Sequence, residues 1–308
     1  MTFNDGATPL ESLGETVAAS PSAEAVAVRR AAEDGVTAIW KPGEVILGLY
    51  EVKGTLGEGG MGTVYQVHHK SWNTDLAVKS PKPEELAKAG GAENFVREAE
   101  TWVNLGLHPH IVSCYYVRTL GGIPRVFAEY VEGGSLAQWI RDRRLYEGGP
   151  KKALERMLDI AIQFAWGLDY AHEQGLIHQD VKPANVMMAA DGTVKVTDFG
   201  LARARGRVTV PGEAKPGGTL MAASGGMTPA YASPEQARGE VLTRRTDIWS
   251  WGVSLLEMFT GEVTWLAGQA AAEALQGYLE SGADEPGLPE MPKPMINGFF
   301  SSIALMRL

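Results

Sequence analysis

The sequence has little cysteine, fewer positive than negative charges, and no long hydrophobic run. Cys114 is the only cysteine, so no disulfide can form within the chain, as is typical of the reducing cytoplasm. Asp and Glu number 37 against 28 Lys and Arg, and the net charge of −9 argues against nucleic acid as the main partner. No run of about 18 uncharged apolar residues occurs, and the acidic N-terminus lacks a secretory pattern. We therefore expect a cytoplasmic protein with no membrane segment in this chain.

The remaining composition is that of a globular protein, and its patterning changes along the chain. Residues 1–40 are rich in Ala, Glu, Ser and Thr, which predicts a disordered tail or linker. Residues 41–131 alternate as strands do, whereas residues 132–308 have mostly helical periodicity, with an irregular tail over 281–308. The change near residue 131 predicts an α+β fold of two lobes, the first β-rich and the second α-helical.

Four glycines stand between two alternating segments of the first lobe, and three of them have G-x-G-x-x-G spacing. Gly57, Gly59 and Gly62 separate the strands expected over 50–56 and 63–68. A dinucleotide-binding turn would need a helix after the glycines, and none is expected here. A strand–glycine loop–strand can lie over phosphates with its backbone N–H groups exposed, but an ordinary turn carries about equal weight.

A lysine and a glutamate follow in the same lobe. Lys79 closes an apolar strand over 76–79, and Glu98 lies on the inner face of a helix expected over 92–105. A core-facing Glu needs a cation, and Lys79 is the nearest candidate in sequence. The alternatives are a snorkelling lysine at a strand end and a glutamate at the core boundary.

Helical signals dominate the second lobe. Ser135 and Gln138 form a capping-box pattern at the start of one helix. Apolar residues keep helical spacing over 154–171, and Gly175 ends that helix. Residues 247–259 predict a buried helix and 270–280 an amphipathic one, while 201–227 lack periodicity and predict a long mobile loop.

Four polar residues are set into turns between residues 178 and 200. The pattern predicts short strands over 177–178, 186–188 and 194–197, with Asp191-Gly192 as a hairpin turn. Asp180, Lys182, Asn185 and Asp198 lie on the connecting turns. Two acids, an amide and an ammonium in such loops suit a site that binds metal and polyphosphate.

Five motifs occur together in one order. They are Gly57-x-Gly59-x-x-Gly62 with Val64, Leu76-Ala77-Val78-Lys79, Val96-Arg97-Glu98-Ala99, His178-Gln179-Asp180-Val181-Lys182-Pro183-Ala184-Asn185, and Asp198-Phe199-Gly200. The segment Ala232-Ser233-Pro234-Glu235 follows them. Over roughly residues 48–280 this arrangement resembles the protein kinase catalytic domain of the bacterial Ser/Thr type. The resemblance implies the bilobal protein kinase fold.

The resemblance also implies a signalling Ser/Thr protein kinase that acts on protein substrates, with ATP and Mg²⁺, or Mn²⁺ in its place, as cofactors. The implied catalytic residues are Asp180, Lys182, Lys79, Glu98 and Thr228. The implied ATP contacts are Gly57, Gly59, Gly62, Val64, Ala77, Lys79, Glu129, Val131 and Met187, and the implied metal ligands are Asn185 and Asp198.

The implied roles follow from positioning and charge stabilisation in phosphoryl transfer. Asp180 accepts or orients the substrate hydroxyl proton, Lys182 steadies the transferred phosphoryl group, and Thr228 hydrogen-bonds near both. Lys79, held by Glu98, contacts phosphates. Backbone groups of Glu129 and Val131 meet adenine, while Val64, Ala77 and Met187 sandwich its ring.

Two substitutions depart from the family pattern at the site. Gln179 replaces the Arg that normally pairs with a phosphorylated activation loop, which predicts activity without a phosphate there. Arg203, Arg205 and Arg207 remain alternative phosphate partners. The small Ala128 before Glu129 predicts a pocket behind adenine and sensitivity to bulky ATP analogues.

Two further departures concern spacing and length. The distance from Glu98 to Pro109 is about one residue long for the family, which leaves Glu100 as a second candidate for the helix acid. The family's last helices have no counterpart, so Glu235 lacks its usual cation, at a cost of a few kcal/mol if unpaired. We expect a truncated or frame-shifted chain, with a sensor, repeat domain or membrane anchor beyond it.

Two other functions remain open at this point. A pseudokinase that binds or scaffolds would keep the fold without phosphoryl transfer, but the intact Lys79, Asp180, Asn185 and Asp198 favour an active enzyme. A small-molecule phosphotransferase of similar fold is the more distant alternative. The glycine loop, Thr228 and the segment ending at Glu235 favour a protein substrate.

Overall fold

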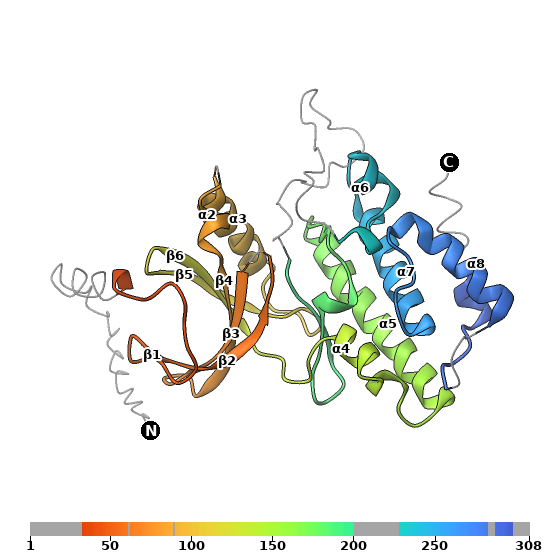
Figure 1. The fold of residues 1–308 in the computed structure, drawn as a ribbon, viewed down its shortest axis with the longest axis horizontal. Coiled ribbons are helices and arrows are strands. Elements are labelled where there is room, and N and C mark those ends of the chain that lie inside the picture. The colour runs from red at the N-terminus through yellow and green to blue at the C-terminus, as the bar shows by residue number, and fades with distance from the viewer. Residues whose placement is uncertain (1–32, 61, 89, 200–227, 283–286, 298–308) are drawn as a thin grey trace, which may run out of the picture.

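The computed structural model describes residues 33–60, 62–88, 90–199, 228–282 and 287–297. Figure 1 shows a sheet-rich lobe, the N-lobe, at one end of the molecule and a helical lobe, the C-lobe, at the other. The predicted two-lobed α+β fold is therefore confirmed. The predicted mobile loop over 201–227 and most of the predicted tails lie outside the described residues.

The N-lobe is built on one antiparallel sheet with the strand order β1-β2-β3-β4-β6-β5. Its strands are β1 (Val45–Ile46), β2 (Tyr50–Glu58), β3 (Gly62–His69), β4 (Thr74–Pro81), β5 (Cys114–Leu120) and β6 (Ile123–Glu129). Two helices, α2 (Pro83–Leu86) and α3 (Gly91–Asn104), follow β4, and α3 packs against β5 and β6. The predicted hairpin with glycines near its tip is formed by β2 and β3.

Both faces of β6 are buried, which explains its almost continuous apolar sequence. Phe127 faces a small cluster that includes Tyr50, Val67 and Leu76. Its neighbours Val126 and Ala128 belong instead to the large cluster that extends under α3 and through the C-lobe. Because successive side chains of a strand point to opposite faces, one strand links two hydrophobic cores.

The C-lobe consists of helices around the two-stranded hairpin β7–β8. Its helices are α4 (Leu136–Arg141), α5 (Pro150–Glu173), α6 (Pro234–Arg238), α7 (Arg244–Thr260) and α8 (Ala271–Ser281). Short 3₁₀ turns are η1 (Arg144–Tyr146), η2 (Pro183–Asn185), η3 (Pro229–Tyr231) and η4 (Gly268–Ala270). The predicted capping box at Ser135 and the predicted buried helix, which is α7, are both present.

The hairpin of β7 (Val186–Met188) and β8 (Val194–Val196) turns at Asp191-Gly192, as predicted. The strand predicted over 177–178 was wrong, because no ladder partner is present for it among the described residues. The backbone N–H of His178 instead donates to the carboxylate of Asp247 on α7 at 2.8 Å. A side chain thus satisfies the backbone group that a second strand would otherwise pair.

The last part of the predicted tail, residues 33–40, is not a tail. Trp40 is buried in the N-lobe core with Tyr65, and the backbone N–H of Gly121 donates to the Glu33 carbonyl oxygen at 2.7 Å. Residues 1–32 lie outside the described part of the chain. None of the helices that the structure describes is long and apolar enough to cross a membrane.

Candidate active site

A cleft of about 550 Å³ lies between the two lobes. It is lined by most of the residues predicted to contact ATP: Gly57, Val64, Ala77, Lys79, Glu129, Val131 and Met187, together with the predicted metal ligand Asp198. Gly59 and Gly62 do not line it. Gly59 follows the end of β2, and its N–H donates to the carbonyl of Gly62 at 2.9 Å, which closes the hairpin.

On the C-lobe side of the site, Asp180, Lys182 and Thr228 form a closed ring of hydrogen bonds. The Lys182 ammonium Nζ donates to Asp180 Oδ2 and to Thr228 Oγ1, both at 2.6 Å. The Thr228 hydroxyl in turn donates to Asp180 Oδ1 at 2.9 Å. The expected contact of Thr228 with both residues is thus present, although 46 residues separate it from Lys182.

Asn185 is attached to the same ring. It is buried at the end of η2, and its amide Nδ2 donates to the backbone carbonyl of Asp180 at 2.8 Å. The backbone carbonyl of Asn185 accepts the N–H of Thr197 at 3.0 Å, which joins the turn at 180–185 to the end of β8. This bond ties the predicted metal ligand Asn185 to the segment that carries the other one, Asp198.

Asp247 on α7, which the sequence analysis did not identify as a site residue, holds the backbone before Asp180. Its fully buried carboxylate accepts the N–H groups of His178 and Gln179, each at 2.8 Å, and His172 Nε2 at 2.7 Å. Gln179 has a φ of 68°, a conformation uncommon for a residue with a side chain. Its carbonyl accepts Gln236 Nε2 at 2.7 Å, so the unusual backbone is held from both sides.

Lys79 forms an ion pair with Asp198, with Nζ 3.2 Å from Oδ1. The lysine comes from β4, where Val126 is its partner in the ladder, and Asp198 follows β8 with a φ of 64°. Glu98 is 7% exposed on the inner face of α3, as predicted. The ion pair observed for Lys79 is with the predicted metal ligand, and its pairing with Glu98 stays a prediction.

The small Ala128 opens the inner end of the cleft. Trp102 of α3, Val112 and Val126 line the cleft together with Ala128, and the Trp102 indole N–H donates to the Val112 carbonyl at 2.9 Å. The site therefore extends beyond Ala128 toward α3. The expected sensitivity to bulky ATP analogues stays a prediction.

The connection between the lobes, residues 129–131, is anchored by a carboxylate. Besides the predicted backbone position of Glu129 at the cleft, its side chain accepts from Lys195 of β8 at 2.8 Å and from the N–H of Ser113 at 3.1 Å. Sequence analysis assigned only the backbone of Glu129. The position of a lysine three residues before Asp198 is a sequence signal that could have indicated this pair.

A divalent metal would need ligands other than the protein at this site. The described residues contain no group of three His, Cys, Asp or Glu side chains that could hold a metal ion. Asp198 and the amide Asn185 fit Mg²⁺ nonetheless, because this ion binds through one or two carboxylates, retained waters and substrate phosphates. The donor set thus fits a metal that arrives with a nucleotide.

The segment after Thr228 rests on α7. The Tyr231 hydroxyl donates to Glu257 Oε2 at 2.6 Å, and Ser250 Oγ donates to the Tyr231 carbonyl at 2.8 Å. Burial raises the pKa of Glu257 to about 7, although the bond from Tyr231 opposes the rise. Burial likewise raises the pKa of Tyr231, and the neighbouring Glu257 carboxylate adds to it.

Glu235 was expected to lack a cation. In the described part of the chain it forms no ion pair, and its Oε1 accepts the hydroxyl of Thr246 at 2.8 Å. The side chain is only partly buried. A hydroxyl donor thus takes the place of a cation and the carboxylate keeps access to solvent, so the expected penalty of a buried, unpaired charge does not arise.

Comparison with known proteins gives one consistent result. The protein kinase domain family model matches residues 50–284. The chain is 35% identical over 268 residues to the probable serine/threonine-protein kinase SCO3848 of Streptomyces coelicolor, covering 85% of this chain and 37% of that protein. It is 37% identical over 237 residues to PknB of Mycobacterium tuberculosis, covering 75% of this chain and 35% of that protein. The chain thus spans little more than a third of the length of these relatives.

Solved structures give the same fold. The PknI kinase domain of Mycobacterium tuberculosis aligns with a TM-score of 0.56 and 24% identity over 86% of this chain and 100% of that one. A mutant of the same PknI domain aligns with a TM-score of 0.57 and 25% identity over 86% of this chain and 99% of that one. The order of motifs, the two lobes and the matched family model lead to one assignment: this chain belongs to the protein kinase domain family.

Proposed function

We propose that the chain is the catalytic domain of an ATP-dependent Ser/Thr protein kinase. The observation that carries this proposal is the ring formed by Asp180, Lys182 and Thr228. It gathers a carboxylate, an ammonium and a hydroxyl within 2.9 Å of one another beside the cleft. Packing alone does not require such a set, because partly buried charges are costly unless they are paired.

The site residues would divide the work of phosphoryl transfer. Asp180 would accept or orient the proton of the attacking hydroxyl, and Lys182 would balance negative charge that develops nearby. Its ammonium already touches Asp180 at 2.6 Å, so it holds the carboxylate in place before substrate arrives. ATP would supply the phosphoryl group, and a divalent metal would neutralise part of its charge.

Lys79 of the N-lobe would hold the phosphates, while Asp198 and Asn185 of the C-lobe would hold Mg²⁺. The 3.2 Å pair between Lys79 and Asp198 supports this assignment, because it brings a phosphate-binding cation beside a metal-binding carboxylate. The exposed glycines Gly57 and Gly59 would let the hairpin backbone approach the phosphates closely. Glu129 and Val131 at the cleft would meet adenine through their backbones, while Val64, Ala77 and Met187 would contact its ring.

We further propose that the acceptor is a protein and that the domain works in the cytoplasm. Thr228 and the segment through Tyr231, anchored on α7, offer a fixed surface beside Asp180. The single buried Cys114 suits a reducing compartment. A pseudokinase is the alternative, since the ion pair of Lys79 with Asp198 would also stabilise a cleft that catalyses no reaction.

The test is phosphate transfer from Mg-ATP to a generic protein acceptor. Wild type should phosphorylate Ser and Thr, whereas Asp198→Asn and Lys79→Ala should lose most of the activity. Glu240→Gln, an exposed carboxylate that forms its ion pair with Arg238, is the matched control and should leave the rate unchanged. Equal and negligible phosphate transfer by wild type and both site variants would refute the proposed kinase activity and favour the pseudokinase alternative.

A further inference from the structure

Residues 33–40, which we call the N-terminal strap, pack against the N-lobe although the family match begins only at residue 50. The strap's last residue, Trp40, is 2% exposed and lies 5.5 Å from the Tyr65 ring. At the strap's other end, the Glu33 carbonyl accepts the N–H of Gly121. The strap is therefore docked at both ends on a surface of this chain's own sheet.

Arg125 on β6 binds the strap, and its side chain is fully buried. Its guanidinium donates to the carbonyls of Thr37 at 3.2 Å and Ala38 at 2.8 Å, and to those of Leu120 and Ile123. Burial lowers the pKa of this arginine to about 10, so it stays charged at neutral pH.

The charge of Arg125 depends on the strap for much of its stabilisation. Within the described residues Arg125 has no carboxylate partner, and two of its four carbonyl acceptors come from the strap. The Trp40 ring adds a cation–π contact, with the guanidinium carbon 4.4 Å from the ring centroid. Without the strap, the N–H groups that donate to Thr37 and Ala38 would lose these acceptors, and the buried Nε has no acceptor among the described residues even with the strap in place. Such unsatisfied donors on a buried cation are strongly unfavourable.

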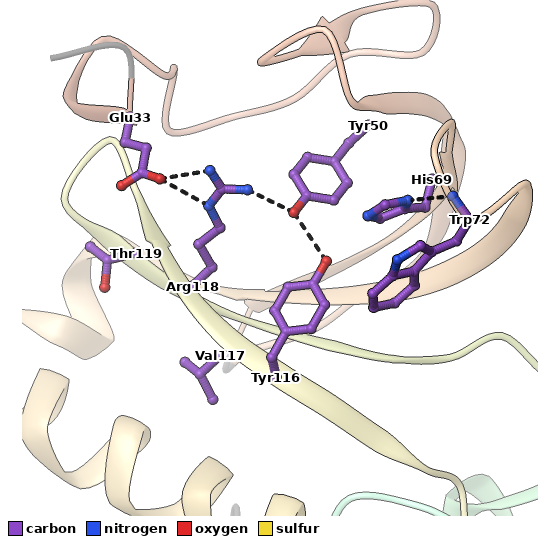
Figure 2. A pocket seen from close by; sticks show the side chains of 8 residues that line it. All are labelled: Glu33, Tyr50, His69, Trp72, Tyr116, Val117, Arg118 and Thr119. Carbon is purple, nitrogen blue, oxygen red and sulfur yellow. Dashed lines mark hydrogen bonds and ion pairs between the residues drawn. The ribbon is translucent and has the colours of Figure 1, made fainter. Parts of the chain in front are cut away.

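A second anchor holds the start of the strap. Glu33 pairs with Arg118 of β5 at 2.6 Å, Arg118 donates to the Tyr50 hydroxyl at 2.9 Å, and that hydroxyl bonds Tyr116 at 3.0 Å. Figure 2 shows this chain of contacts running from the strap across the outer face of the sheet. Gly121 has a φ of 59°, and a Cβ there would overlap the Val36 carbonyl, so the turn is shaped to receive the strap.

The strap is bonded to a residue of β6 that is next in sequence to the ladder partner of Lys79. Arg125 precedes Val126, which is the ladder partner of Lys79, and Ala128 on the same strand pairs with Ala77. Val126, Ala128 and Lys79 all line the cleft. A shift of β6 that brought Arg125 to water would therefore displace the cleft wall and Lys79.

We propose that the N-terminal strap is a positioning element of the kinase domain, held by Arg125, and that its docking sets the affinity of the cleft for ATP. Arg125 touches no nucleotide and acts through the register of β6 with β4. The inference rests on the proposed ATP-binding function. It also makes residues outside the matched family segment part of the working active site.

The experiment uses full-chain Arg125→Lys, which keeps a cation but loses the planar fork that reaches two sets of carbonyls. Strap docking is read from amide exchange of the Gly121 N–H, and ATP affinity from equilibrium titration with Mg-ATP. We expect faster Gly121 exchange and an ATP affinity weakened about tenfold, equivalent to about 1.4 kcal/mol. Trp40→Ala should act in the same direction, and Trp40→Phe, which keeps a ring, should recover most of the affinity.

The control is Val67→Ala, buried in the same cluster on β3 without a hydrogen bond to the strap. It should lower the unfolding temperature but leave Gly121 exchange and ATP affinity near wild type. The inference is overturned if Val67→Ala weakens ATP binding as much as Arg125→Lys, or if Arg125→Lys leaves either readout unchanged. If the wild type binds no Mg-ATP, the proposed function is refuted as well. If the wild type binds Mg-ATP and Arg125→Lys binds it equally well, only the proposed role of the strap is refuted.

Discussion

The two sides of the cleft differ in how far their functional residues are already fixed by the protein. On the C-lobe side, Asp180 is bonded to Lys182, Thr228 and Asn185 at distances between 2.6 and 3.3 Å. On the N-lobe side, residues 55–58 are largely exposed, and a Cβ on Gly57 or Gly59 would meet nothing within 4 Å. One side is pre-organised, and the other is open.

This difference follows from what each side must do. Proton transfer and charge stabilisation need groups held within a fraction of an ångström, because little energy is then spent on reorganisation during the reaction. A loop that covers phosphates must instead let the nucleotide enter and leave. We infer that the C-lobe side is complete without nucleotide and that the N-lobe side is completed by it.

The largest effect is expected from the pre-organised side. Asp180→Asn removes the proton acceptor and should lower kcat about a thousandfold, as loss of a general base typically does. ATP affinity should stay close to wild type, because Asp180 does not line the cleft. Steady-state rates with a peptide acceptor and a separate Mg-ATP titration measure the two quantities. Asp169→Asn, exposed on α5, is the control, and equal losses in both variants would contradict the assigned role.

The ring can also be broken at its hydroxyl. Thr228→Val keeps the shape but removes the bonds that join Lys182 to Asp180 Oδ1, and kcat should fall by about tenfold to a hundredfold. Thr228→Ser keeps the hydroxyl and should recover most of the rate. If the Ser variant is as slow as the Val variant, the methyl group rather than the hydrogen bond is what matters.

Beneath the ring, Glu257 predicts a dependence of stability on pH. Its folded pKa of about 7 exceeds its ordinary value of 4.5, so the folded state binds the proton more tightly. The free energy of unfolding should therefore be highest below pH 4.5 as far as this group is concerned, and fall as pH rises through 7. Between these values the slope is on the order of 1 kcal/mol per pH unit.

Glu257→Gln should remove this slope, because an amide does not titrate. Urea unfolding between pH 5 and about 8 measures it. Glu273→Gln, in the first turn of α8, serves as the control and should keep the wild-type slope. An unchanged slope in Glu257→Gln would mean that another group causes the pH dependence.

On the open side, the same substitution at two glycines should affect different properties, ATP binding at Gly57 and stability at Gly62. Gly57→Ala finds open space, so it should leave stability within about 1 kcal/mol of wild type and weaken ATP binding a few-fold. Gly62→Ala places its Cβ on the Ser80 carbonyl of the neighbouring strand, so it should lower the unfolding temperature. Thermal unfolding and nucleotide titration of both variants distinguish the cases. Equal stability losses would show that the hairpin tip is packed after all.

The smallest effect is expected from removing phosphate groups, which should leave turnover almost unchanged. Gln179 replaces the usual Arg, and its backbone is held by Asp247 and Gln236 without a phosphate. Phosphatase treatment should therefore leave turnover within about twofold of the untreated enzyme. A collapse of turnover would instead implicate Arg203, Arg205 or Arg207 as phosphate partners.

Much of the fold and site was predictable from sequence because local pattern and long-range order agreed. Alternation, the capping box at Ser135 and the hairpin turn at Asp191 are local signals, and the structure contains each of them. Thr228 was placed beside Asp180 only through the family resemblance, because no local rule joins residues so far apart. The roles of the site residues remain proposals.

The features that sequence did not predict depend on tertiary contacts. Asp247 lies in the first turn of α7, and nothing local shows that it receives two backbone N–H groups from the loop before Asp180. Because the N–H of His178 donates to Asp247, the strand expected over 177–178 does not form. The strap was predicted to be part of a tail because residues 1–40 as a whole carry little aliphatic bulk. The strap contacts Arg125, a charged residue whose burial no local pattern indicates.

Amide hydrogen exchange with and without a non-hydrolysable Mg-ATP analogue tests the comparison most directly. Within residues 178–185, the N–H groups of His178, Gln179, Asp180 and Asn185 should exchange slowly in both states, since they donate to Asp247, His178 and Lys182. Residues 55–60, whose ladder and turn bonds lie at an exposed hairpin tip, should exchange faster than those amides when the protein is alone and gain about tenfold protection on binding. If residues 178–185 instead gain as much protection as residues 55–60, the C-lobe side is not pre-organised and the account is wrong.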